Sequence, residues 1–120
     1  MVQSIDGVLN QLMAVIESRR AGSPEVSYTA RLLHGGVDAI GAKVIEEAAE
    51  VVEAAGEPGD AGRKHVVDEA ADVLYHLWVL LAARHVPVED VAAELRRWFG
   101  MSGLEEKASR DRLDSEEDDG

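Results

Sequence analysis

The sequence predicts an all-α protein, a bundle of four to five helices that homodimerisation completes. Apolar residues recur every three to four positions in successive segments, and glycine or proline separates these segments. No stretch shows the alternation of apolar and polar residues that is typical of a strand. A chain of 120 residues is long enough for one hydrophobic core. We therefore expect one domain over residues 1–110, followed by a tail at 111–120.

The first helix is predicted between residues 5 and 16. Its apolar residues fall on one helical face: Ile5, Val8, Leu9, Leu12, Met13 and Ile16. We expect it to end near Gly22-Ser23-Pro24, because glycine and proline both disfavour continuation of a helix. A short helix over residues 27–33 should follow, with Ser27 as its N-cap and Gly35-Gly36 at its end.

Two longer helices are predicted next, over residues 37–55 and about 62–84. The first of them ends at the breaker sequence Gly56-Glu57-Pro58-Gly59. In the second, apolar residues cover more than half of the helix circumference, so this helix needs burial on several sides. A chain this small has too few other helices to bury it. We therefore expect a homodimer with this helix near the interface.

A fourth helix is predicted from Pro87, which suits a first helical turn, to Gly100. Its apolar residues are Val88, Val91, Ala92, Leu95, Trp98 and Phe99. Residues 101–110 are expected to form an irregular arm or a short helical turn. The tail at 111–120 carries six acids, one arginine and a single large apolar residue, and this composition predicts disorder.

The charge of the chain excludes some classes of partner. The formal net charge is -12, and a net charge of -7 remains on residues 1–110 without the tail. Such a surface repels phosphate backbones and anionic lipids, so we expect neither nucleic-acid nor membrane binding. An anionic substrate would need bound divalent cations.

Cysteine usage and hydropathy narrow the class of protein further. The absence of cysteine excludes a disulfide scaffold, a zinc ribbon and a thiol nucleophile. The start of the chain lacks a secretory signal pattern, and no apolar stretch approaches the roughly 20 residues of a membrane span. A soluble cytoplasmic protein is expected.

Two acidic motifs lie on the two long helices: Glu46-Glu47-x-x-Glu50 on the first and Glu69-x-x-Asp72 on the second. Glu47 and Glu50 fall at one edge of their apolar stripe, whereas Glu46 points nearly opposite it. Antiparallel packing of the helices can bring Glu47, Glu50, Glu69 and Asp72 into one cluster. Their repulsion is relieved if they bind hard divalent cations, or if they point apart into water.

Other kinds of site fit less well. A ferritin-like di-iron site needs Glu-x-x-His, and neither acid pair includes histidine. His76, four residues after Asp72, can orient that acid, although a histidine hydrogen-bonded within a packed helix is the favoured reading, and we do not assign it as a ligand. The glycines between Gly56 and Lys64 lack the spacing of a phosphate-binding loop.

The two acidic motifs together resemble the signature of the all-α nucleoside-triphosphate pyrophosphatase (MazG-like) superfamily. Longer segments are similar to the phosphoribosyl-ATP pyrophosphatase family in particular. They are Ser27 to Ala30, Lys43 to Val51, Glu69 to Leu77 and Ser102 to Arg110, the last reading Ser-Gly-Leu-Glu-Glu-Lys-Ala-Ser-Arg. The resemblance covers most of residues 5–110.

This resemblance implies hydrolysis of the α-β phosphoanhydride of phosphoribosyl-ATP, which yields phosphoribosyl-AMP and pyrophosphate in the second step of histidine biosynthesis. It implies Mg²⁺ as cofactor, with Glu47, Glu50, Glu69 and Asp72 as its ligands and one acid as a candidate base for the attacking water.

The resemblance also suggests residues that bind the nucleotide substrate. Lys43, Lys107 and Arg110 are candidate phosphate contacts, and Ser27, Tyr28 and Thr29 offer hydroxyl groups to the ribose or the phosphates. Lys43 can instead pair with Glu47, and capping by Ser27 needs no substrate.

Two other functions stay open at this point. A relative of the superfamily could act on another nucleoside or deoxynucleoside triphosphate, and a helical dimer with solvated acids could be non-catalytic. The family often occurs fused to phosphoribosyl-AMP cyclohydrolase, the enzyme of the next step. We expect this chain to be the stand-alone form, functionally coupled to that cyclohydrolase.

Overall fold

The computed structural model describes residues 4–99 and 110–111 of the chain. Within these residues it contains four helices and no strand, which confirms the all-α prediction. The helices are α1 (Ile5–Ser18), α2 (Tyr28–Ala55), α3 (Gly59–Ala83) and α4 (Val88–Trp98). The chain divides into two compact units, Met1–Val88 and Glu89–Gly120.

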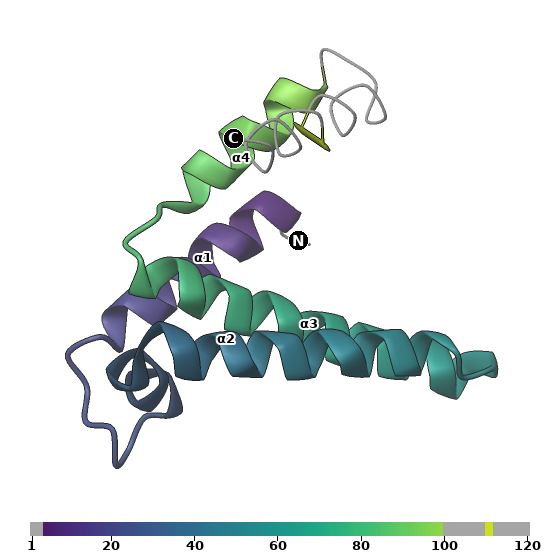
Figure 1. Cartoon of the computed structure of the whole chain (residues 1–120), viewed down its shortest axis with the longest axis horizontal. Coiled ribbons are helices and arrows are strands. Elements are labelled where there is room, and N and C mark those ends of the chain that lie inside the picture. The colour runs from purple at the N-terminus through teal and green to yellow at the C-terminus, as the bar shows by residue number, and fades with distance from the viewer. Residues whose placement is uncertain (1–3, 100–109, 112–120) are drawn as a thin grey trace. The chain divides into compact units, whose positions relative to one another are not determined.

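The first unit is built around the antiparallel hairpin of α2 and α3, which lie side by side (Figure 1). Only three residues, 56–58, separate the two helices. The turn is tight because Gly62 in the first turn of α3 has no side chain. A Cβ atom at Gly62 would lie 2.2 Å from the carbonyl oxygen of Glu57. The hairpin therefore places residues of α2 directly opposite residues of α3.

Helix α2 breaks at Gly36, where φ is +86° and ψ is −179°. Only glycine readily adopts this conformation. In Figure 1 the short piece before Gly36 is seen nearly end-on, whereas the long piece after it runs along the hairpin. The short piece begins at Tyr28, after Ser27, whose hydroxyl accepts a hydrogen bond from the Ala30 N–H at 3.1 Å. The predicted short helix with its Ser27 cap is confirmed.

The hydrophobic core lies where α1, the start of α2 and the second half of α3 meet. Its buried members are Ile16, Leu32, Ile40, Trp78, Val79 and Ala82. Trp78 also donates a hydrogen bond from its indole nitrogen to the Leu9 carbonyl at 3.1 Å, which joins α3 to α1. Because α1 packs at this end of α3, apolar residues nearer the hairpin turn, among them Val52 and Val67, stay exposed.

Some helix limits differ from the prediction. Helix α1 ends at Ser18, before Gly22, and the side chain of Arg20, two residues later, contacts α3. Its guanidinium binds Glu17 at 2.9 Å and donates to the Ala82 carbonyl at 2.7 Å. Helix α3 begins at Gly59, about three residues early, and α4 begins directly after Pro87.

The predicted end of the fourth helix at Gly100 and most of the arm and tail lie outside the described residues. Arg110 and Asp111 have helical backbone. Among the described residues, no helix combines the length and the hydropathy needed to cross a membrane.

We predict that Gly36→Ala destabilises the protein by about 1–3 kcal/mol, because alanine is strained at this positive φ. A Cβ at Gly36 would meet no atom within 4 Å, so the loss would report backbone strain alone. The matched control is Gly41→Ala, which also meets no atom within 4 Å but lies in regular helix. Urea unfolding should show that this control stabilises the protein by about 0.5–1 kcal/mol. Equal effects of the two substitutions would contradict the assignment of a break at Gly36.

Candidate functional site

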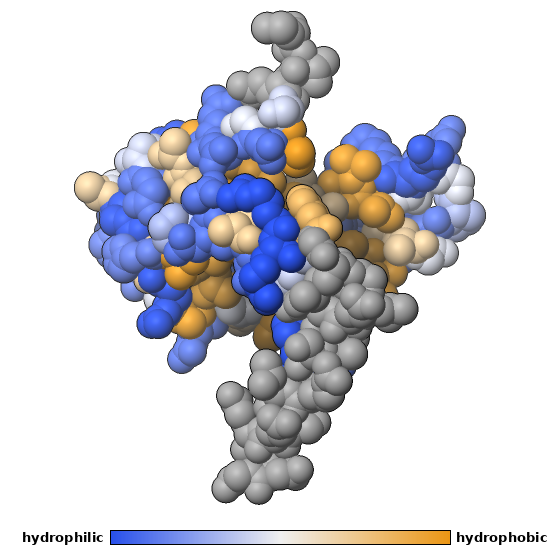
Figure 2. Space-filling model, turned by 90° about the horizontal axis from the view of Figure 1, so that it is seen from above, coloured by the Kyte–Doolittle hydropathy of each residue, from blue (hydrophilic) through white to orange (hydrophobic). Residues whose placement is uncertain are grey.

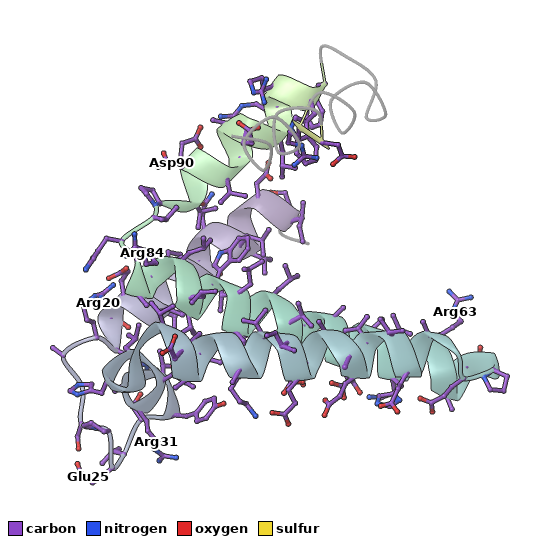
Figure 3. The ribbon with its side chains drawn as sticks, viewed as in Figure 1. Arg20, Glu25, Arg31, Arg63, Arg84 and Asp90 are labelled. Atoms are coloured by element: carbon purple, nitrogen blue, oxygen red, sulfur yellow. The ribbon has the colours of Figure 1, made fainter. Side chains whose placement is uncertain are left out.

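Three of the predicted carboxylates meet across the α2–α3 hairpin. Glu47 and Glu50 come from α2 and Glu69 comes from α3, and each offers an oxygen that lies within 4.8 Å of the others. Asp72 is exposed and lies close enough for its charge to raise the pKa of Glu69. Figure 3 shows side chains with oxygen tips along one side of the hairpin and mainly carbon side chains along the other. The structure thus assembles the predicted cluster, with Asp72 at its border.

Burial distinguishes Glu47 from an ordinary surface glutamate. Its exposed fraction is 8%, and its Oε2 atom is buried without a hydrogen-bond partner, as is Oε2 of Glu69. Burial is the main cause that raises the pKa of Glu47 to about 7. A hydrogen bond with Glu50 and the negative charge of Glu50 add to this rise. The hydrogen bond with Glu50, followed by burial, raises the pKa of Glu69. Ionising this cluster therefore costs free energy.

A hard divalent cation fits this arrangement. Such cations take carboxylate oxygens as ligands, and both buried Oε2 atoms lack any other partner. The alternative in which the acids point apart into water does not describe Glu47, Glu50 and Glu69. It does describe Glu46, which the sequence pattern placed outside the cluster and which is exposed beside Lys43.

Lys43 lies at the end of the cluster nearest to Tyr28. Its ammonium is 3.4 Å from a carboxylate oxygen of Glu46 and 3.9 Å from one of Glu47. The negative charge of Glu46 is the main cause that raises the pKa of Lys43, and the interaction with Tyr28 adds to it. The predicted pairing with Glu47 thus exists, and the Lys43 side chain stays about one-third exposed beside the carboxylates.

The hydroxyl groups of residues 27–29 already have partners. Ser27 caps α2, and the Thr29 hydroxyl is hydrogen-bonded to the Tyr75 hydroxyl. The Tyr28 hydroxyl lies 3.0 Å from Nε2 of His76. The contacts of Tyr28 and Thr29 hold the start of α2 against α3.

His76 is a buried histidine within a packed helix, as the sequence favoured. Its Nδ1 donates to the Asp72 carbonyl at 2.8 Å, because a carbonyl can only accept. In the neutral ring, Nε2 then accepts the hydrogen bond from Tyr28. His76 thus fixes the Tyr28 hydroxyl. Its other hydrogen bond goes to the backbone carbonyl of Asp72 and does not involve the Asp72 carboxylate.

Of the basic residues predicted for the arm, the structure describes Arg110. Arg110 belongs to the second unit, where its guanidinium carbon lies 4.4 Å from the centre of the Trp98 ring. Lys107 lies outside the described residues. The roles of both in phosphate binding stay predictions.

Sequence reasoning missed His65 and Glu57. Nε2 of His65 lies 3.3 Å from a carboxylate oxygen of Glu69, and its Nδ1 is hydrogen-bonded to the Glu57 carboxylate. The spacing of four residues between His65 and Glu69 was a usable signal, because such residues share a helical face. No local pattern indicated Glu57, which lies in the turn.

Comparisons with a family model and with individual known proteins all point to the same family. Residues 9–98 match the family described as phosphoribosyl-ATP pyrophosphohydrolase. A phosphoribosyl-ATP pyrophosphatase of Rhodopirellula baltica is 53% identical over 102 residues, which cover 85% of each chain. One of Trichlorobacter lovleyi is 53% identical over 86% of this chain and 93% of its own. One of Burkholderia cenocepacia is 46% identical over the full length of both chains.

The raised pKa of Glu47 predicts a pH dependence of stability in the presence of a chelator. The folded state keeps the proton to about pH 7, whereas the unfolded state releases it near 4.5. Between these values the folded state binds more protons, so this group lowers the free energy of unfolding as pH rises through the window.

Glu47→Gln should remove this contribution and raise the urea midpoint at pH 8 in EDTA. The neighbouring Glu46→Gln is the control, because Glu46 is exposed, and it should not raise the midpoint. A midpoint for Glu47→Gln equal to that of the parent chain would show that the buried carboxylate carries no such cost.

Proposed function

The chain belongs to the phosphoribosyl-ATP pyrophosphohydrolase family, and we propose that it splits the α-β phosphoanhydride of phosphoribosyl-ATP in a Mg²⁺-dependent reaction. The products are phosphoribosyl-AMP and pyrophosphate, which makes this the second step of L-histidine biosynthesis, in the cytoplasm. The observation that carries the proposal is the cluster of Glu47, Glu50 and Glu69, with two buried carboxylate oxygens that have no hydrogen-bond partner.

The carboxylates would hold Mg²⁺ through Glu47, Glu50 and Glu69, with Asp72 at the border of the site. A divalent cation held there would neutralise charge on the phosphate oxygens and would favour activation of the attacking water. An acidic chain needs such neutralisation, since phosphoribosyl-ATP is itself strongly anionic. Water adds to phosphorus, the bond from phosphorus to the bridging oxygen breaks, and a carboxylate oxygen of the cluster accepts the proton of the attacking water.

The side chains beside the cluster suit the rest of the substrate. The Lys43 ammonium offers charge-assisted hydrogen bonds to a phosphate group. The Tyr28 hydroxyl, fixed by His76, keeps its oxygen available as an acceptor for a ribose hydroxyl. Thr29 and Ser27 contribute by holding the start of α2 in place.

We also propose that the protein acts as a homodimer through the apolar face of the hairpin. Five residues of α2 and α3 line an open groove with a volume of about 310 Å³: Ala48, Val51, Ala70, Val73 and Leu74. Ile45, Val52 and Val67 are each more than 60% exposed on the same two helices. Apolar residues are visible on the hairpin in Figure 2. A contiguous apolar surface of this kind is typical of an interface, and in an isologous dimer it would pack against the equally apolar face of a second copy.

The catalytic proposal predicts Mg²⁺-dependent release of pyrophosphate from phosphoribosyl-ATP by the purified chain. Glu50→Gln and Asp72→Asn should each lower kcat/KM by more than about a hundredfold, because loss of a residue that only supports a ligand already costs 10–100-fold. Asp68→Asn is the control, since Asp68 pairs with Lys64 on the surface of α3, and it should keep full activity.

The same assay should include a panel of canonical and noncanonical triphosphates, with EDTA replacing Mg²⁺ in one arm. Preference for another triphosphate would reject phosphoribosyl-ATP as the substrate. If the folded protein hydrolyses none of these triphosphates, the catalytic proposal is wrong and a non-catalytic helical dimer is favoured.

The dimer proposal predicts that Val52→Asp weakens self-association by at least about tenfold, because a charge would be buried without a partner. Val52 is 73% exposed in the single chain, so its own fold should tolerate the change. Val26→Asp, at a site 87% exposed in the connection before α2, is the control. Sedimentation equilibrium measures both. A monomeric parent chain at all concentrations would reject the dimer.

A further inference from the structure

A chain of hydrogen-bonding groups runs from the α2–α3 turn to the carboxylate cluster. Glu57 in the turn is hydrogen-bonded to Nδ1 of His65, and Nε2 of His65 lies 3.3 Å from Oε1 of Glu69. Glu69 is one of the three clustered carboxylates. The imidazole therefore has a carboxylate oxygen at each ring nitrogen, and one of these carboxylates belongs to the site.

The tight turn is what brings Glu57 to His65. Gly62 is buried against the Glu57 backbone, where a Cβ would lie 2.2 Å from the carbonyl oxygen. His65 lies three residues after Gly62, one turn further along the same side of α3. The carboxylate of Glu57 can therefore reach a histidine eight residues ahead in the chain.

The hydrogen-bonding groups of the three side chains are complementary. Each ring nitrogen of His65 faces a carboxylate oxygen, and an ionised carboxylate can only accept a hydrogen bond. The contact with Glu57 therefore orients the imidazole ring, and the opposite ring nitrogen lies beside Glu69.

The two oxygens of Glu69 have different surroundings. Oε1 lies beside His65, whereas Oε2 is buried and has no hydrogen-bond partner. The Glu69 side chain is only 16% exposed, which distinguishes this contact from an ordinary surface pair. The neighbouring pair of Lys64 and Asp68, on the same turns of α3, is a surface pair, with both side chains more than half exposed.

We propose that His65 is a positioning residue of the site: Glu57 orients the imidazole, and the imidazole holds Glu69 so that Oε2 is available to a divalent cation together with Glu47 and Glu50. This inference rests on the proposed function, in which the cluster binds such a cation. Groups that hydrogen-bond to metal-binding side chains set their orientation, and their loss typically lowers metal affinity about 10–100-fold.

The test measures Mn²⁺ binding to the full chain by electron paramagnetic resonance, with Mn²⁺ as the probe and Mg²⁺ as competitor. His65→Phe should lower the affinity about tenfold or more, and Glu57→Ala should lower it by a smaller factor. His65→Gln should recover most of the loss, because its carboxamide can still donate to Glu69. Lys64→Gln is the matched control on the same helix and should bind as the parent chain does.

A kinetic comparison separates positioning from a general structural effect. For His65→Phe, raising the Mg²⁺ concentration should restore kcat toward the parent value, whereas a distorted hairpin would not respond. Circular dichroism checks that the helices of each variant are intact.

Two outcomes overturn the proposal for His65. If His65→Phe binds Mn²⁺ as tightly as the parent chain while Glu69→Gln loses binding, the cation site stands and the role of His65 falls. If the parent chain shows no saturable Mn²⁺ binding, the cation site of the proposed function falls as well.

Discussion

The enclosure of like charges between two facing helices is the constraint on which the rest of the structure depends. Glu47, Glu50 and Glu69 converge across the hairpin, and two of their oxygens are buried without hydrogen bonds. Without a cation, burial and mutual repulsion raise the pKa of Glu47 to about 7. Such an arrangement persists only if other interactions hold α2 against α3.

Those interactions are distributed along the hairpin. At one end, Ile16, Ile40 and Val79 are fully buried in the core that α1 completes. At the other end, the absence of a side chain at Gly62 allows the turn to close directly on α3. The carboxylates lie between these two fixed ends. Preorganised acids of this kind reduce the rearrangement that cation binding would require.

The two sides of the hairpin have different chemical character. One carries the carboxylates with Lys43 and Tyr28 beside them, and the other presents an open apolar groove (Figures 2 and 3). The proposed dimer would bury the apolar side, add contacts to both helices and leave the acidic side open to substrate. The cation site and the dimer interface would then both stabilise α2 and α3, which fits a chain with a small hydrophobic core of its own.

The sequence by itself determined the helices, the break after Gly35 and the acids that cluster, because helical periodicity, capping and glycine effects depend on residues three to four positions apart. It also identified the family, through the motifs around Glu47 and Glu69. Only the tertiary structure decided that Glu47 is the buried acid, that His76 fixes Tyr28 from 48 residues away, and that Glu57 reaches His65. These contacts depend on the turn and on the packing of one helix against another, and neither leaves a periodic pattern in the chain.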